Sequence, residues 1–486
     1  MNKVGQKTFI DLPAVLFAEI LCRWLDLRSL VRLDSAACNR EIRDTLLELL
    51  ASSHCVYTSS VNVENSLVVS WFRVRKLQMS DLSINAYFPE LVKYLRVHFS
   101  SIRQLTCLRS EAIGMMNSYI RNLNTLTFRN IIAVPQLGDC LWLNANVQEL
   151  RIERVVNLSY SHFDGLKLPQ LRLLSLRGSR CDDELLGVIV RSTSVMQRID
   201  IGQCKLITDA GVIALAQCCP LLSALGLSEL PISDGALLQV TQLCPRITSI
   251  DLSDNDVITD LGVSAVAGNL NNLRSISIRE SDSLSDVSIE HLTRCNASTL
   301  QSLHGGGLRL VRVAVLVSLL KNCPHLHTLS LDCDLNAYHA DIVPHMYNLR
   351  TLTTFTVLSD DVLCLIANHC QKLQQLGIYS IYRYVKPNVT PTTTDDVEVP
   401  FSEATGHTRV MHEANTRAEY EENILTEKGL LALMDGLYQL RVLGVRSEEL
   451  TIGQLPPFAQ SVWRRLRPHI VFVDKPDFFH FNPLLE

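Results

Sequence analysis

The sequence predicts an α/β solenoid with parallel strands on its concave side and helices on its convex side. An apolar L-x-x-L-x-L core returns about every 25 residues between residues 74 and 445. Between the cores, a Thr-Asp or Ser-Asp pair repeatedly precedes a stretch with apolar residues at helical spacing. A strand–turn–helix unit of this length cannot bury its apolar face alone, so neighbouring units must stack into one continuous core.

The second apolar position of each core sets the predicted register of the strands. Successive cores are 21 to 28 residues apart as far as Leu376. This period predicts a horseshoe of about 14 repeats. The predicted positions are, in order, Leu77, Leu105, Leu126, Leu150, Leu174, Ile199, Leu225, Ile250, Ile276, Leu303, Leu329, Leu352, Leu376 and Leu443.

Helix-capping residues mark the second half of each unit. The segments ITDAGVIALAQCCP, ISDGALLQVTQLCP, ITDLGVSAVAGNLN and LSDVSIEHLTRC each carry Thr or Ser followed by Asp near their start. These side chains can accept hydrogen bonds from the free N–H groups of a first helical turn. Each segment therefore predicts a helix that follows its strand after a short turn.

Six cysteines recur at equivalent places in these units. Cys219, Cys244 and Cys323 precede proline just before the next strand, where a helix must end. The units resemble the cysteine-containing subfamily of leucine-rich repeats. No C-x-x-C pair and no Cys/His cluster with zinc spacing occurs, so we expect buried packing thiols, no metal and no cofactor. The six are Cys204, Cys219, Cys244, Cys295, Cys323 and Cys370.

The chain is mildly acidic, with a net charge of −5 and an isoelectric point near 6.3. This balance predicts neither nucleic acid nor a membrane as a partner. No stretch approaches the ~20 apolar residues that span a bilayer, and the first residues lack the pattern of a signal peptide. Because 15 cysteines then indicate reduced thiols, we expect the protein in the cytoplasm, the nucleus or both.

Residues 11–50 precede the repeats and predict three short helices. Asp11 can cap a helix with Pro13 in its first turn, and Leu16, Ile20 and Leu21 follow on one face. Leucines then recur at helical spacing as far as residue 50. Three helices of this length make a very small core, so the segment needs a partner or the first repeat to be stable.

This N-terminal segment resembles the F-box. The family signature begins Leu-Pro, continues with Glu-Ile and a leucine pair, and runs Leu-x-x-Leu to a Cys. The matching residues are Leu12, Pro13, Glu19, Ile20, Leu25, Leu30, Leu33 and Cys38. The basic pair and Trp that follow in the signature are replaced by Asn39, Arg40 and Glu41. The resemblance implies that a Skp-type adaptor, and through it a cullin, is contacted by Leu12, Pro13, Ile20, Leu25 and Leu30.

An F-box followed by leucine-rich repeats implies the substrate-recognition subunit of an SCF-type cullin-RING ubiquitin ligase. Such a receptor holds a protein substrate near the ubiquitin-conjugating enzyme and needs no catalytic residue, so we expect no enzymatic activity in this chain. The alternative is a repeat scaffold or signalling regulator without a ligase connection, whose N-terminal helices only cap the first repeat. A catalytic function would require an organised polar pocket at Gly305 to Gly307 or a bound metal.

The substrate surface is predicted from the alternation of side chains along each strand. Residues between and just after the last two apolar positions of a core point away from it, onto the concave face. These residues are mixed and mostly polar, which specifies no class of partner. They are Arg151, Glu153, Arg177, Asp200, Asp251, Arg279, His304, Asp332, Tyr379 and Arg446.

One interval, from Leu376 to Leu443, spans 67 residues and exceeds a single repeat. Its excess, about residues 386–424, is rich in Thr, Pro and acidic residues and is expected to lack fixed structure. It is either an inert surface insertion or a lid over the concave face, anchored by Phe401, Met411 and Tyr420. The predicted organisation is an F-box-like helical module at 1–55, the solenoid at 56–450 and a C-terminal cap at 451–486.

Overall fold

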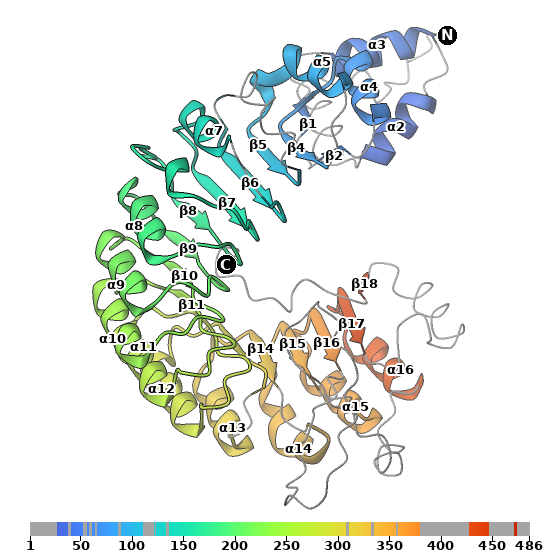
Figure 1. Cartoon of the computed structure of the whole chain (residues 1–486). Helices are drawn as coiled ribbons and strands as arrows, with labels where there is room; N and C mark the ends of the chain where they lie inside the picture. Colours follow the sequence, from blue (N-terminus) through green and yellow to red (C-terminus); the bar gives the residue numbers. More distant parts are fainter. Residues whose placement is uncertain are drawn as a thin grey trace, which may run out of the picture. The chain divides into compact units, whose positions relative to one another are not determined.

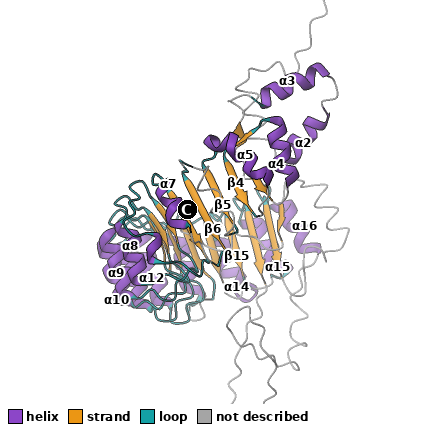
Figure 2. Ribbon diagram, turned by 45° about the horizontal axis from the view of Figure 1, so that its top comes forward, coloured by secondary structure: helices purple, strands orange, loops and turns teal. Residues whose placement is uncertain are grey.

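The strands and helices alternate along the chain and form two stacks. The computed structural model describes residues 27–36, 40–51, 56–57, 61–63, 66–85, 89–109, 121, 123–132, 136–307, 311–331, 335–355, 358–379, 427–446 and 471–473. Its contacts form two units, of which unit 1 extends to Ser277 and unit 2 begins at Ile278. In each unit the parallel strands lie side by side and the helices cover one face of the sheet (Figures 1 and 2). We call the opposite face of each sheet the strand face.

The main sheet of unit 1 is parallel throughout and follows the order of the sequence. A separate short pair joins β1 (Val56–Tyr57) to β3 (Gln78–Met79). The strands of the main sheet are β2 (Val61–Val63), β4 (Asp81–Ile84), β5 (Gln104–Cys107), β6 (Thr125–Arg129), β7 (Glu149–Glu153), β8 (Leu173–Ser175), β9 (Arg198–Asp200), β10 (Ala224–Gly226), β11 (Ser249–Asp251) and β12 (Ser275–Ser277).

The helices of unit 1 begin with two that precede the sheet, α2 (Leu27–Ala36) and α3 (Arg40–Leu50). Short 3-10 turns, Phe99–Ser101 and Tyr160–His162, supplement or replace the helix in two repeats. The helices between strands are α4 (Ser66–Arg75), α5 (Pro89–His98), α7 (Leu137–Leu143), α8 (Asp183–Arg191), α9 (Asp209–Cys218), α10 (Asp234–Leu243) and α11 (Asp260–Asn269).

Unit 2 repeats the same alternation. Its strands, again parallel and in sequence order, are β13 (Ser302–Gly305), β14 (Thr328–Leu331), β15 (Thr351–Thr354), β16 (Gln375–Tyr379), β17 (Val442–Arg446) and β18 (Val471–Val473). Its helices are α12 (Asp286–Asn296), α13 (Val313–Asn322), α14 (Leu335–Ile342), α15 (Asp360–His369) and α16 (Glu427–Gly436), with a 3-10 turn at Val343–His345. The predicted solenoid of strand–turn–helix repeats is therefore confirmed.

The predicted register is confirmed for the apolar core positions from Leu105 onward. Neighbouring strands place these side chains directly opposite one another, as in Leu225 and Ile250, and each is nearly or fully buried. The prediction was wrong for Leu77. This residue closes helix α4, and the core position of the first long strand is Leu82, which lies opposite Leu105. Strand β18 lies in the segment assigned to the cap and pairs with β17.

The predicted helix caps are confirmed, and they also link successive repeats. Thr259 caps α11 by accepting from the N–H of Leu261. Its own N–H and hydroxyl both donate to Asp234, the first residue of the preceding helix α10, at 2.9 and 2.6 Å. The same pair of bonds joins Thr208 to Asp183 and Ser233 to Asp209. Each of these carboxylates therefore holds the start of the next helix in place.

A glycine in the first turn makes room for two of these carboxylates. A Cβ atom at Gly211 would lie 2.0 Å from Oδ1 of Asp183, and one at Gly262 would lie 2.3 Å from Oδ1 of Asp234. No side chain fits at such distances, so glycine is required here by close approach and not by backbone conformation.

Most of the recurring cysteines are packing residues, as predicted. Buried thiols occupy positions 204, 219, 244, 323 and 370. Burial raises the pKa of Cys204 and of Cys370 to about 12. The prediction was wrong for Cys295, which is exposed because Asn296, the last residue of α12, takes the buried position instead.

The N-terminal helices are attached to the first repeat by one buried carboxylate. Asp34 of α2 is 3% exposed and receives hydrogen bonds from Trp71 and Arg75 of α4, the closest at 2.8 Å. Arg43 of α3 donates to its backbone carbonyl. Two of the three predicted N-terminal helices are thus present and bound to α4, whereas residues 11–25 lie outside the described residues, as does the insertion at 386–424.

Candidate functional site

The strand face of unit 1 carries the best-defined group of polar side chains. Alternation along each strand places Ile199 and Ile201 in the core and leaves Asp200 on the strand face. The parallel register then sets Asp200 of β9, Gly226 of β10 and Asp251 of β11 side by side. Asp200 and Asp251 were both predicted on this face, and the structure brings them to the two sides of one glycine.

Gly226 leaves a gap in the row of side chains, and Asp200 leans into this gap. A Cβ atom at Gly226 would lie 2.6 Å from Oδ1 of Asp200. That oxygen accepts the backbone N–H of Gly202 at 2.9 Å, and Asp251 accepts the N–H of Ser253 in the same way at 3.1 Å. Both carboxylates are almost fully buried, at 2% exposure.

Arg177, the third predicted residue of this group, extends from the end of β8 across Gly202 toward both carboxylates. Its Nη1 lies 3.5 Å from Oδ1 of Asp200 and 3.9 Å from Oδ2 of Asp251. These distances give ion pairs rather than good hydrogen bonds. The guanidinium is 29% exposed, so the group opens to solvent on this side.

Three buried serine hydroxyls flank the carboxylates. Within the described part of the chain, the hydroxyls of Ser228, Ser249 and Ser275 have no hydrogen-bond partner. Ser228 is 1% exposed, and its Oγ lies 2.5 Å from the point that a Cβ of Gly202 would occupy. Nη1 of Arg177 and Oδ1 of Asp200 surround the same point, at 2.7 and 3.1 Å. The hydroxyl of Ser228 is therefore directed into the group of charges. We call Asp200, Gly226, Ser228 and Asp251 the acidic site.

The acidic site is electrostatically unbalanced. Burial raises the pKa of the Asp200 carboxyl, and the nearby Asp251 and Glu153 raise it further, against the opposing effects of Arg177 and the Gly202 N–H. One guanidinium thus faces two carboxylates in a region from which water is largely excluded. An additional positive charge placed there would stabilise the ionised form of both carboxylates.

The other predicted residues of unit 1 belong to separate ion pairs on the same face. Glu153 binds Arg129, at 2.7 Å, and accepts from the hydroxyl of Ser175. Arg151 and Arg198 both approach Glu149 of β7, at 3.6 and 3.7 Å. These pairs are partly exposed, and such pairs contribute about 0–1 kcal/mol each.

The predicted residues of unit 2 do not form a comparable group. His304 of β13 is 8% exposed, and burial together with Arg279 lowers its pKa to about 3, so it is uncharged at neutral pH. Tyr379 and Arg446 occupy paired positions at the ends of β16 and β17. Asp332 lies outside the described residues.

The glycines that follow His304 are occupied by packing. A Cβ at Gly306 would lie 2.5 Å from the ring of Phe355, and one at Gly307 would lie 2.8 Å from the carboxylate carbon of Glu280. Gly307 also has φ of +84°, in the left-handed region that favours glycine. These glycines therefore serve close packing.

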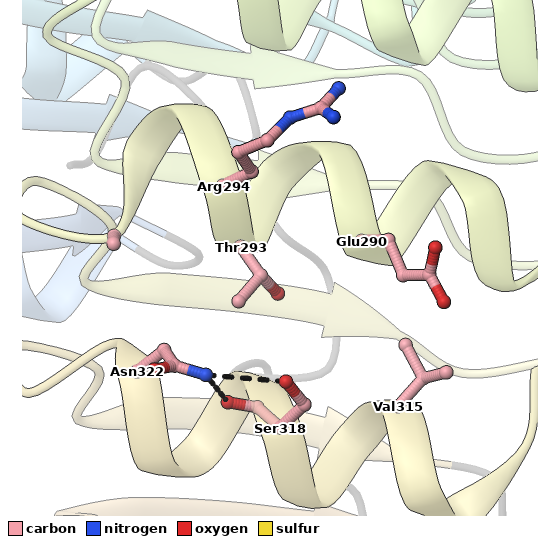
Figure 3. Close-up of a pocket in the computed structure, with 7 residues that line it drawn as sticks. Glu290, Thr293, Arg294, Val315, Ser318 and Asn322 are labelled. Atoms are coloured by element: carbon pink, nitrogen blue, oxygen red, sulfur yellow. Dashed lines mark hydrogen bonds between the residues drawn. The ribbon is translucent and has the colours of Figure 1, made fainter.

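Unit 2 has a groove of about 370 Å³ on its helix face, between α12 and α13. Glu290, Thr293 and Arg294 of α12 face Ser318 and Asn322 of α13 across it. Figure 3 shows the Arg294 side chain directed away from α13, while the Asn322 amide donates to the carbonyl and hydroxyl of Ser318 at 2.8 and 3.2 Å. Because its polar groups do not converge, this groove is a weaker candidate than the acidic site.

The predicted adaptor contacts fall mainly outside the description. Leu12, Pro13, Ile20 and Leu25 belong to residues that the structure does not describe. Leu30 lies in α2 and is 1% exposed, so in this conformation it packs inside the chain and offers no surface to a partner.

The described residues contain no group of three His, Cys, Asp or Glu side chains that could hold a metal ion. None of the described helices has the length and apolar composition needed to cross a membrane.

Two residues of the acidic site, Gly226 and Ser228, were not identified from the sequence. Gly226 occupies the position between the last two apolar residues of its core, where its neighbours carry Asp200 and Asp251. A glycine flanked by two acids at equivalent positions of adjacent repeats was the available signal.

Comparison with known proteins supports the repeat architecture. A family profile described as Leucine Rich repeat matches residues 194–216 and 244–267, which cover β9, α9 and most of the β11–α11 repeat. No F-box profile matches the N-terminal segment.

Three solved structures are similar to this chain. An internalin (inlF) from Listeria monocytogenes is 17% identical, with a TM-score of 0.37 over 69% of this chain and 85% of that one. The Rad7 and Elc1 complex in yeast gives 16% identity and a TM-score of 0.44, over 78% and 91%. A TLR13–ssRNA13 complex gives 15% identity and 0.38, over 83% and 58%. From the profile match and the observed strand–turn–helix register, the chain is a leucine-rich-repeat protein.

Proposed function

We propose that this protein is the substrate-recognition subunit of an SCF-type ubiquitin ligase. The proposal combines the F-box signature in residues 12–38 with the attachment of the N-terminal helices to the repeats. Asp34 carries this argument, because it ties α2 to α4 through Arg75 and Trp71. A receptor must hold its substrate at a defined distance from the adaptor, and a buried bidentate ion pair is a stiff joint.

The division of labour follows from the two kinds of surface. The N-terminal helices would bind a Skp-type adaptor through Leu12, Pro13, Ile20 and Leu25. The repeats would bind the substrate on the strand face of unit 1, where the acidic site lies. The chain itself would take no part in bond chemistry, since placing a lysine near a charged conjugating enzyme raises its effective concentration without any catalytic group.

One observation favours the alternative, a repeat scaffold without a ligase connection. Leu30 and Asp34 are both buried against the rest of the chain, as expected of helices that only cap the first repeat. Repeat arrays need such caps to shield their terminal apolar surface. On this alternative, the N-terminal helices contribute stability and bind nothing.

Co-purification with a Skp-type adaptor distinguishes the two functions. The full-length chain and the variant Leu12→Ala/Ile20→Ala are each mixed with the adaptor and analysed by size-exclusion chromatography. The ligase proposal expects the adaptor to elute with the wild type and not with the variant, at an unchanged melting temperature. A variant that melts several degrees lower, from a wild type that never retains the adaptor, supports the scaffold alternative. Asp200→Asn, which alters the distant strand face, serves as the matched control and should retain the adaptor.

A further inference from the structure

We propose that the acidic site binds one basic side chain, a lysine or an arginine, of a partner protein. The inference rests on the proposed function only in requiring that the strand face of unit 1 binds a protein. It adds the chemistry by which that protein is recognised.

The geometry provides a recess of the right kind. Gly226 supplies a floor without a side chain, and the neighbouring strands place Asp200 and Asp251 on its two sides. Adjacent strands lie about 4.8 Å apart, so the two carboxylates flank a gap one strand wide. Ser228 lies two residues farther along β10 and faces the same side of the sheet.

The charge of the recess favours a cation. Arg177 is the one basic side chain that forms a printed ion pair with either carboxylate among the described residues, and it is shared between both. The other cations on this face are engaged elsewhere: Arg129 binds Glu153, whereas Arg151 and Arg198 lie at Glu149. With both carboxylates ionised, the recess keeps a negative charge that a second cation would neutralise.

The buried hydroxyl of Ser228 supplies the independent evidence for a ligand. A buried hydroxyl without a hydrogen bond is costly, and such groups are rare in native proteins. Ser228 has no partner in the described structure although it is 1% exposed and directed at Arg177 and Asp200. An ammonium group has three donors and could bind Asp200, Asp251 and Ser228 together. An acidic side chain would be repelled by the carboxylates, and an apolar one would leave the hydroxyl unpaired.

The test uses small probes that present a single side chain to the full-length protein. N-acetyl-lysinamide and N-acetyl-argininamide are titrated, and binding is followed by saturation-transfer NMR. N-acetyl-norleucinamide is the control, because it has the stem of lysine without the charge. We expect transfer to a basic probe and none above background to the norleucine compound.

Variants of the site complete the test. Asp251→Asn should weaken the basic probe about tenfold, the loss expected when a hydrogen bond to a charged group becomes neutral. Ser228→Ala, which removes only a hydroxyl and carries little risk to folding, should weaken it severalfold. Glu149→Gln removes an equal charge from the same face and should leave binding within about twofold. Melting temperatures verify that each variant is folded.

Three results would overturn the proposal. They are equal transfer to the norleucine control, an equal loss in Glu149→Gln and Asp251→Asn, and no transfer to either basic probe. Each of these results is independent of adaptor binding, because the adaptor experiment depends on the N-terminal helices. A failure of the ligase proposal would likewise leave the basic probe bound.

Discussion

A single methyl group at Gly262 should destabilise the repeats, although alanine is the better helix former. The added Cβ would lie 2.3 Å from Oδ1 of Asp234, which would have to move. The carboxylate would then lose its bonds to the N–H and hydroxyl of Thr259, now 2.9 and 2.6 Å long. Hydrogen bonds to charged groups contribute about 1.5–3 kcal/mol each when buried, and this pair is partly exposed, so we expect Gly262→Ala to cost roughly 2 kcal/mol.

The same change should be harmless once the carboxylate is gone. Asp234→Ala by itself removes both bonds to Thr259 and should also cost about 2 kcal/mol. In that background, Gly262→Ala no longer displaces anything essential, and the helix gains up to about 1 kcal/mol from replacing glycine. The two substitutions should therefore be strongly non-additive, by about 2–3 kcal/mol.

Urea unfolding monitored by circular dichroism, with hydrogen exchange of the α11 amides, measures this cycle. Gly268→Ala is the matched control, since Gly268 lies in the same helix with nothing within 4 Å of an added Cβ. It should stabilise the helix by up to about 1 kcal/mol. If Gly262→Ala costs as much with Asp234 absent as with it present, the clash with the carboxylate is not the reason for the glycine.

Three further predictions concern other parts of the molecule. Asp34→Ala leaves the guanidinium of Arg75 without its buried partner and should cost about 3 kcal/mol, seen as faster hydrogen exchange in α2 and α3; unchanged exchange there would contradict the joint. Iodoacetamide should modify Cys295 in the folded protein but not Cys204, whose pKa burial raises to about 12, until urea unfolds the chain; equal rates would show that the repeat does not protect its thiols. The raised pKa of Asp200 means that the folded state binds its proton more tightly than the unfolded state, so stability should decline as pH rises above the unfolded pKa of 3.8. Asp200→Asn should lack this decline, and urea midpoints that differ equally from wild type at pH 3.5 and pH 7 would refute the assignment.

The repeat itself could be predicted because its constraints are local. Spacing between apolar residues set the register from Leu105 onward, and Thr or Ser before Asp located the helix starts. Leu77 was misassigned because the first strand has no repeat before it to fix its register. Cys295 was misassigned by one residue, because α12 continues through Asn296 and the sequence does not show which of the two turns inward.

The acidic site could be predicted only in part. Alternation along the strands placed Asp200, Asp251 and Arg177 on one face, but it gave no partners for them. Their grouping depends on what is missing at Gly226 and Gly202, where any side chain would collide with Asp200 or Arg177. His304 shows the converse, since a position on the strand face does not make a side chain accessible.

The bonds between helix starts give the array a direction. In each pair the acceptor comes first in the sequence: Asp183 precedes Thr208, Asp209 precedes Ser233, and Asp234 precedes Thr259. During synthesis, domains generally fold from the N-terminal end, so each new repeat would emerge beside a carboxylate already in place. Removing repeats from the C-terminal side would leave the remaining helix starts bound, whereas removing them from the N-terminal side would strip the first remaining helix of its acceptor. The chain is thus suited to being built, and shortened, from one end only.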